Sequence, residues 1–134
     1  MTRRAIVPAS MQALYRDWRM SPGLEVDGFV FLTGFNGVPL EGALSDDART
    51  QIETAFDQVF AVLGEAGMDA ADIVEVTSYH VGLRDHLPSF REAWAARMRE
   101  PYPAWTAIEV AGFATEGVVV ELRVIAWRGE GSCA

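Results

Sequence analysis

The sequence predicts an α+β fold in which two amphipathic α-helices cover one face of a β-sheet. Segments rich in β-branched and aromatic residues alternate with segments whose apolar residues recur at helical spacing. Their order along the chain is a hairpin, a helix, a strand, a helix and two strands. The length of 134 residues, with no repeat or linker, predicts one domain over residues 1–134.

A β-hairpin is predicted over residues 24–34, where LEVDGFVFLTG places the two-residue turn signal Asp27-Gly28 between two short strands. The glycines and proline of residues 35–42 break regular structure and predict a loop. A helix is expected next, because Ser45 can cap its first turn and two aspartates follow at the positive end of the helix dipole. Its apolar face consists of Ile52, Phe56, Val59, Phe60 and Leu63.

The second half of the chain predicts a strand, a helix and two further strands. Residues 73–83, IVEVTSYHVGL, are rich in β-branched and aromatic residues and predict a long strand. The helix is expected to begin near Asp85 and to carry Pro88 in its first turn. Strands are expected at 105–110 and 118–127, joined by the turn GFATEG. The apolar face of the helix consists of Leu87, Phe90, Trp94 and Met98.

The last strand indicates that the second face of the sheet is also covered. One set of alternating residues is wholly apolar, whereas the other combines Val119, Ile125 and Trp127 with Glu121 and Arg123. So much apolar surface beside charges is unfavourable in water for a domain of this size, so we expect it to pack against another subunit. The sequence therefore predicts an oligomer with polar groups at its interface.

Composition argues against several classes of partner. Eleven basic and nineteen acidic residues give a formal charge of −8, which disfavours nucleic acid as a partner. The apolar run of residues 29–32 is far shorter than the roughly 20 residues of a membrane span. No apolar segment follows the arginines near the start, so we expect no secretory signal and a cytoplasmic location.

Cysteine and histidine give little support for a metal site. Cys133 is the only cysteine, which excludes an internal disulfide and predicts an inert thiol. His80 and His86 lack the spacing of a metal motif, so we expect no metal and no cofactor. Within its predicted strand, His80 is either a core residue with satisfied ring nitrogens or a catalytic base. The core interpretation is favoured, because no second titrating partner is identifiable nearby in the sequence.

Four strings of the chain, taken in order, resemble the reactive intermediate deaminase family, called RidA or YjgF and earlier endoribonuclease L-PSP. They are FVFLTG, VLGEAGMDAADIVEVTSY, PAWTAIEV and VVVELRVIA, and the resemblance runs from about Met20 to Ala126. It implies a chorismate-mutase-like α+β subunit with a mixed sheet. It also implies a homotrimer around a central barrel, with ligand clefts between neighbouring subunits.

The resemblance also implies where a ligand is bound. Deaminating members hold the substrate carboxylate with an arginine directly after a Pro-Ala pair, and a glutamate of the last strand positions water. Here Trp105 follows the Pro-Ala pair, whereas Glu121 falls at the position of the glutamate. Thr33 and Gly34 stand where the family has a hydroxyl residue and glycine. Two other cleft positions differ, with Met20 in place of a tyrosine and Phe35 in place of a glutamine.

The missing arginine changes the expected substrate. An arginine binds a carboxylate by two charge-assisted hydrogen bonds, whereas the indole of Trp105 has one neutral donor and an apolar face. Activity on small imino acids should therefore be lower by orders of magnitude. Trp105 is either a stacking platform for a larger conjugated ligand or a packing residue at the subunit interface.

Other residues have a functional and a structural interpretation. Glu121 is either the residue that passes protons or a carboxylate paired with Arg123 on the same face. Glu109 shares its strand face with Trp105 and Ala107 and is a candidate second carboxylate of the cleft. Arg91 either replaces the missing positive charge or is a solvated residue of the second helix.

The leading hypothesis is a RidA-like trimer that hydrolytically deaminates an enamine or imine other than simple 2-imino acids. A conjugated acid of the aminomuconate type would suit an aromatic pocket, by analogy with the family. The alternative is a trimer that binds a small ligand without catalysis. RNA cleavage follows only from the older family label, and the net charge of −8 argues against it.

Overall fold

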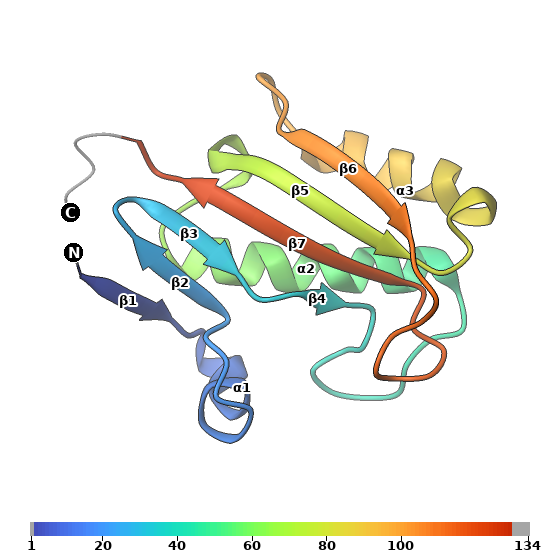
Figure 1. Cartoon of the computed structure of the whole chain (residues 1–134), viewed down its shortest axis with the longest axis horizontal. Coiled ribbons are helices and arrows are strands. Elements are labelled where there is room, and N and C mark those ends of the chain that lie inside the picture. The colour runs from blue at the N-terminus through green and yellow to red at the C-terminus, as the bar shows by residue number, and fades with distance from the viewer. Residues whose placement is uncertain (1, 130–134) are drawn as a thin grey trace.

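The computed structural model describes residues 2–129, and its centre is a seven-stranded mixed sheet (Figure 1). The strand order is β1-β2-β3-β7-β5-β6, and the short β4 also pairs with β7. Among the strands of the described residues, only β5 and β6 run parallel; the other pairs are antiparallel. The strands are β1 (Arg3–Ile6), β2 (Gly23–Val26), β3 (Phe29–Leu32), β4 (Phe35–Asn36), β5 (Ile73–His80), β6 (Ala104–Glu109) and β7 (Val120–Trp127).

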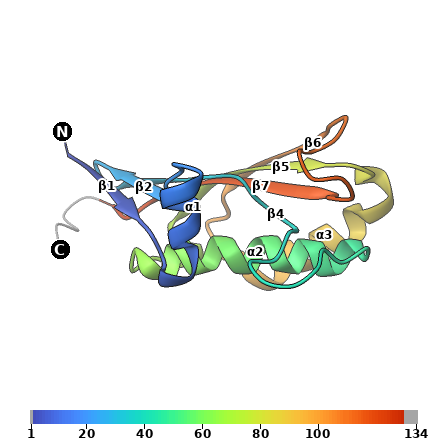
Figure 2. The same cartoon turned by 90° about the horizontal axis from the view of Figure 1, so that it is seen from below.

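Two long helices, α2 (Ala48–Glu65) and α3 (Leu83–Arg97), lie side by side on one face of the sheet (Figure 2). This confirms the predicted α+β class and the helix-covered face. A short helix, α1 (Gln12–Asp17), which the sequence analysis did not predict, precedes β2. Single 3-10 turns occur at Ala9–Met11 and Ala70–Asp72.

Local signals explain the predicted hairpin and the start of α2. Asp27 and Gly28 have φ values of 52° and 84°, so both turn residues between β2 and β3 adopt the left-handed conformation of a tight hairpin. At α2, Asp47 is the N-cap, and its carboxylate accepts a hydrogen bond from the backbone N–H of Thr50. Ser45 is therefore not the cap that was predicted; its hydroxyl accepts from the N–H of Asp47 in the turn before the helix.

The start of α3 differs from the prediction. The helix begins at Leu83 rather than near Asp85, and Pro88 lies in its second turn. The carboxylate of Glu109, at the end of β6, accepts hydrogen bonds of 2.9 and 2.8 Å from the N–H groups of Gly82 and Leu83. These N–H groups have no partner within the helix, and a carboxylate also suits the positive end of the helix dipole.

Strand β7 separates the core from an open face. Val120, Leu122, Val124 and Ala126 are buried beneath the helices, whereas Glu121, Arg123, Ile125 and Trp127 alternate with them on the opposite side. Phe29 and Phe31 of β3 lie on this open face and are 40% and 41% exposed. The ring of Phe29 stacks on Trp127, with 5.9 Å between centroids. The described part of the chain therefore leaves an apolar sheet face uncovered.

Two buried glutamines of α2 form hydrogen bonds with the loops near the start of β7. The side-chain amide of Gln51 donates to the carbonyl groups of Ser45 and Gly117, and its oxygen accepts from the N–H of Val119. Gln58 donates to the carbonyl groups of Asn36, at the end of β4, and of Val38 in the loop that follows. These bonds satisfy backbone groups that would otherwise be buried without partners.

Candidate functional site

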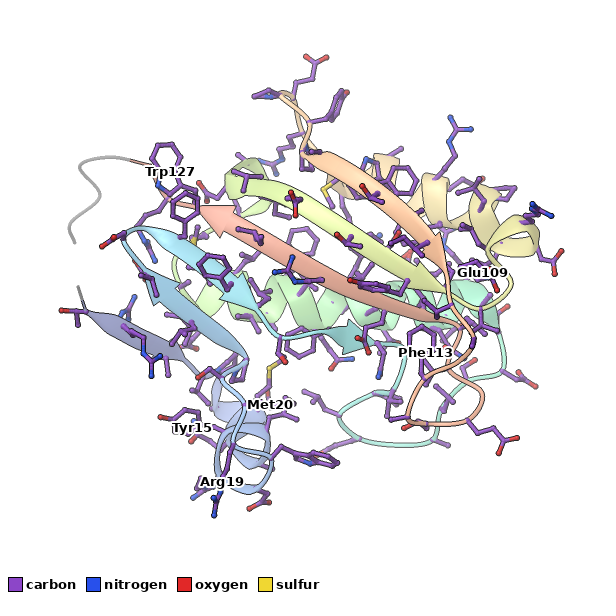
Figure 3. The ribbon with its side chains drawn as sticks, viewed as in Figure 1. Tyr15, Arg19, Met20, Glu109, Phe113 and Trp127 are labelled. Carbon is purple, nitrogen blue, oxygen red and sulfur yellow. The ribbon has the colours of Figure 1, made fainter. Side chains whose placement is uncertain are left out.

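A pocket of about 340 Å³ opens on the uncovered face of the sheet. Strands β5 and β7 form its floor, and the connection between β6 and β7 forms one wall, where Figure 3 labels Phe113. The pocket therefore collects residues from segments far apart in the sequence. Its lining consists of Leu32, Gly34, Tyr79, Val110, Gly112, Phe113, Glu121 and Arg123.

Glu121 is the acidic residue of this pocket, and the backbone fixes its place. It lies opposite Tyr79 of β5 and Asn36 of β4, and its side chain is partly buried. A β-carbon at Gly34 would lie 2.6 Å from Oε2 of Glu121, so the carboxylate occupies space that only glycine leaves free. The side chain of Glu121 makes no hydrogen bond or ion pair with any residue between 2 and 129. Its carboxylate is therefore free to bind water or a ligand.

Arg123 contributes the positive charge of the pocket. It lies two residues beyond Glu121 on the same face of β7. Its ion pair is with Glu75 of β5, where Nη1 and Oε1 are 3.9 Å apart and both side chains are about half exposed. Arg123 and Glu121 therefore do not form the ion pair that the sequence analysis considered as an alternative.

Trp105 lies on the other face of the sheet and does not line this pocket. Its indole stacks on Trp94 and Phe90 of α3, at centroid distances of 4.8 and 5.3 Å. Its Nε1–H donates a 2.8 Å hydrogen bond to the hydroxyl of Ser78. The expectation that Trp105 and Glu121 share one cleft is therefore wrong within a single chain, and packing is the role that these contacts show.

Ser78 connects Trp105 to a buried histidine pair that sequence reasoning missed. Nε2 of His80 is 2.7 Å from the Ser78 hydroxyl, and Nδ1 is 2.9 Å from Nε2 of His86. Burial and, to a lesser extent, the neighbouring His86 lower the pKa of His80 to about 4, against the opposing effect of Glu109. Burial also lowers the pKa of His86, against the opposing effect of Glu109. The structure agrees with the core interpretation of His80, but supplies the titrating partner that the sequence did not reveal.

Glu109 and Ala107 share the face of Trp105 as predicted, but this is the helix side of the sheet. The two backbone hydrogen bonds from Gly82 and Leu83 lower the pKa of Glu109 and commit its carboxylate to the start of α3. Glu109 is therefore not a second carboxylate beside Glu121. Ala107 also does not line the pocket of Glu121.

The other candidate residues are dispersed. Phe35 is 3% exposed in the core beneath β4, because strand alternation turns it toward α2. The Thr33 hydroxyl donates to Sδ of Met20 at 3.7 Å, but neither residue lines the pocket. Arg91 lines a separate groove along α3. Of the sequence candidates, the pocket thus contains Glu121 and Gly34.

Tyr79 and Phe113 are the two aromatic residues among the pocket residues that the sequence analysis missed. The alternation in β5 was a usable signal for Tyr79, since it lies between the buried Ser78 and His80 and so faces the open side. Phe113 lies in the irregular segment after β6, where no periodicity indicates a direction.

Residues 2–129 contain neither a cluster of metal-ligating side chains nor a membrane-spanning helix. No group of three or more His, Cys, Asp or Glu side chains is placed to hold a metal ion in this part of the chain. None of its helices is long and apolar enough to cross a membrane. Cys133 lies outside the described residues.

Comparison with known proteins identifies the family. The sequence profile of the family described as Endoribonuclease L-PSP matches residues 11–128. The chain belongs to this family, also called RidA or YjgF. It is 34% identical over 128 residues to the RutC family protein YjgH of Escherichia coli, covering 92% of this chain and 94% of that protein. The solved structure of protein YJGH superposes with a TM-score of 0.81 at 31% identity, over 95% of this chain and 97% of that one.

One relative in this family has a named activity. The 2-iminobutanoate/2-iminopropanoate deaminase of Salmonella typhimurium is 28% identical over 109 residues, which cover 79% of this chain and 84% of that protein. The resemblance read from the sequence is thereby confirmed at the level of family and fold.

Proposed function

We propose that this member of the RidA family hydrolyses the C=N bond of an imine, or of the imine tautomer of an enamine, and releases ammonia. The observation that carries the proposal is the carboxylate of Glu121, which lies in an open pocket against Gly34 with no partner among the described residues. A relative named as an iminobutanoate and iminopropanoate deaminase supports the reaction class.

The chemistry needs a group that takes and returns protons beside a water molecule. An enamine first becomes an imine by gaining a proton on carbon and losing one from nitrogen, and water then adds to the carbon of the C=N bond. Glu121 takes one proton from that water as it adds and passes it to nitrogen, which gives a carbinolamine. It then passes the hydroxyl proton of the carbinolamine to nitrogen, and ammonia leaves as the C=O bond forms. Glycine at position 34 keeps the carboxylate in place, because any side chain there would displace it.

The proposed substrate is not a simple 2-imino acid. The arginine that follows the Pro-Ala pair in deaminating relatives is replaced by Trp105, which packs on the helix side of the sheet. In its absence, Tyr79 and Phe113 give the pocket aromatic walls that suit a longer conjugated molecule.

We further propose that three chains assemble around the uncovered sheet face. Phe29, Phe31 and Trp127 are each about two-fifths exposed there, which is unfavourable for a face left in water. Sedimentation equilibrium at micromolar concentration should give the mass of three chains. A monomer at that concentration would contradict both the assembly and a pocket completed by a neighbouring subunit.

The reaction is tested by measuring ammonia release from two substrates generated in place. One is 2-iminopropanoate and the other is a conjugated enamine acid of the aminomuconate type, each corrected for spontaneous hydrolysis with heat-denatured protein. We expect clear acceleration with the conjugated acid and little with 2-iminopropanoate. Tight binding without ammonia release from either would favour the alternative, a non-catalytic ligand-binding trimer.

A further inference from the structure

Arg123 is the only cationic side chain among the described residues that line the pocket of Glu121. Its ion pair with Glu75 is long, at 3.9 Å, and both side chains are about half exposed. Exposed pairs of this kind contribute little stability and are easily exchanged for another partner. The guanidinium is therefore available to an anion that enters the pocket.

The spacing along β7 limits which anion can use it. Residues 121 and 123 share a face, and two strand positions separate their α-carbons by about 7 Å. In a 2-imino acid, the carboxylate is bonded directly to the carbon that carries nitrogen. A molecule that reaches Arg123 with its carboxylate and Glu121 with its C=N carbon needs a longer chain between the two groups.

We propose that Arg123 binds the substrate carboxylate and that this carboxylate lies several bonds from the carbon that loses ammonia. The proposal rests on the proposed deamination and names the substrate class of the same pocket. An arginine at 123 thus takes over anion binding from the position after the Pro-Ala pair, but at a different distance from the reacting carbon. The guanidinium can form two parallel hydrogen bonds to the carboxylate, which fixes the direction of the substrate.

The walls of the pocket fit the chain that must connect the two groups. Tyr79 lies directly opposite Glu121 in the neighbouring strand, and Phe113 and Val110 line the pocket from the connection after β6. Aromatic and aliphatic walls favour a flat, conjugated segment over a polar one. The pocket therefore selects an unsaturated enamine acid with its charge at the far end.

The test uses 5-aminopenta-2,4-dienoate, which carries nitrogen and carboxylate at opposite ends of a conjugated chain, and its methyl ester. For wild-type protein, kcat/KM should be about 100-fold higher for the acid than for the ester, since a charge-assisted pair is lost in the ester. In Arg123→Met, that preference should disappear, chiefly through KM. Arg84→Met removes an exposed arginine at the start of α3 and should keep the preference. A full preference for the acid in Arg123→Met would overturn the proposal.

A binding measurement separates this proposal from the reaction itself. Sorbate is an unreactive conjugated carboxylate, and its amide lacks the charge. Calorimetry should show sorbate binding by wild type and by Glu121→Gln, at least about tenfold weaker binding by Arg123→Met, and weak binding of the amide. If no substrate releases ammonia but this pattern holds, the deamination fails and anion binding by Arg123 stands. Equal binding by Arg123→Met, or no binding by wild type, would overturn the role of Arg123.

Discussion

Glu121→Gln is expected to lower kcat for ammonia release by about 100-fold or more, because an amide cannot take a proton from water and return it to nitrogen. Glutamine has nearly the same shape as glutamate, so it fits the space beside Gly34 without moving the backbone. The KM should change much less than kcat, since the anion is proposed to bind elsewhere in the pocket. Steady-state ammonia release from the conjugated enamine acid measures both parameters.

A second substitution, at Gly34, should displace the same carboxylate without changing Glu121 itself. In Gly34→Ala, the new β-carbon would lie 2.6 Å from Oε2 of Glu121, so the carboxylate must move and kcat should fall. The matched control for Glu121→Gln is Glu65→Gln, which removes an exposed carboxylate at the end of α2, far from the pocket lining. Wild-type turnover by Glu121→Gln, with Glu65→Gln also unaffected, would show that Glu121 does not pass protons.

The elements that the sequence predicted well are those specified by neighbouring residues. The hairpin at Asp27 and Gly28 depends on two adjacent backbone conformations, and the start of α2 depends on a cap three residues from its partner. The start of α3 was misplaced because its capping carboxylate, Glu109, comes from 26 residues later in the chain than Leu83. No local pattern carries that information.

For the candidate site too, the sequence could not show on which face of the sheet a residue lies. Alternation correctly places Trp105, Ala107 and Glu109 on one face of a strand, but it cannot say which face of the sheet that is. The face is set by the pairing of β6 with β5, where the hydroxyl of Ser78 accepts a hydrogen bond from the indole N–H of Trp105. Glu121 could be placed from the family resemblance, whereas its neighbour Tyr79 required the register between β5 and β7.

The buried pair of His80 and His86 makes the fold sensitive to mild acid. The Ser78 hydroxyl accepts from Trp105, which leaves its own proton for Nε2 of His80. His80 then carries its proton on Nδ1 and donates it to Nε2 of His86. A proton added to either ring puts a second donor where this chain needs an acceptor. Both imidazoles are therefore held neutral, in agreement with their lowered pKa values.

The free energy of unfolding should therefore fall by at least about 2 kcal/mol between pH 7.5 and pH 5. In the unfolded chain His80 takes up a proton below its ordinary pKa of 6.5, whereas in the folded protein it does so only near a pKa of about 4. Its contribution to stability is complete above pH 6.5 and is lost as the pH falls toward 4. His86 acts in the same direction. Glu25 and Glu53 have lowered pKa values beside arginines, so their contribution is lost mainly below this window.

Urea denaturation at half-unit steps from pH 7.5 to 5 measures this dependence. His86→Gln keeps an amide oxygen that can accept from His80 and removes one titrating ring, so its stability should fall less steeply over the same range. The chain has only two histidines, so their ring resonances can be followed by NMR in the same samples. An imidazole of His80 that titrates near pH 6.5 in the folded protein, with a flat stability profile, would contradict the neutral hydrogen-bonded pair.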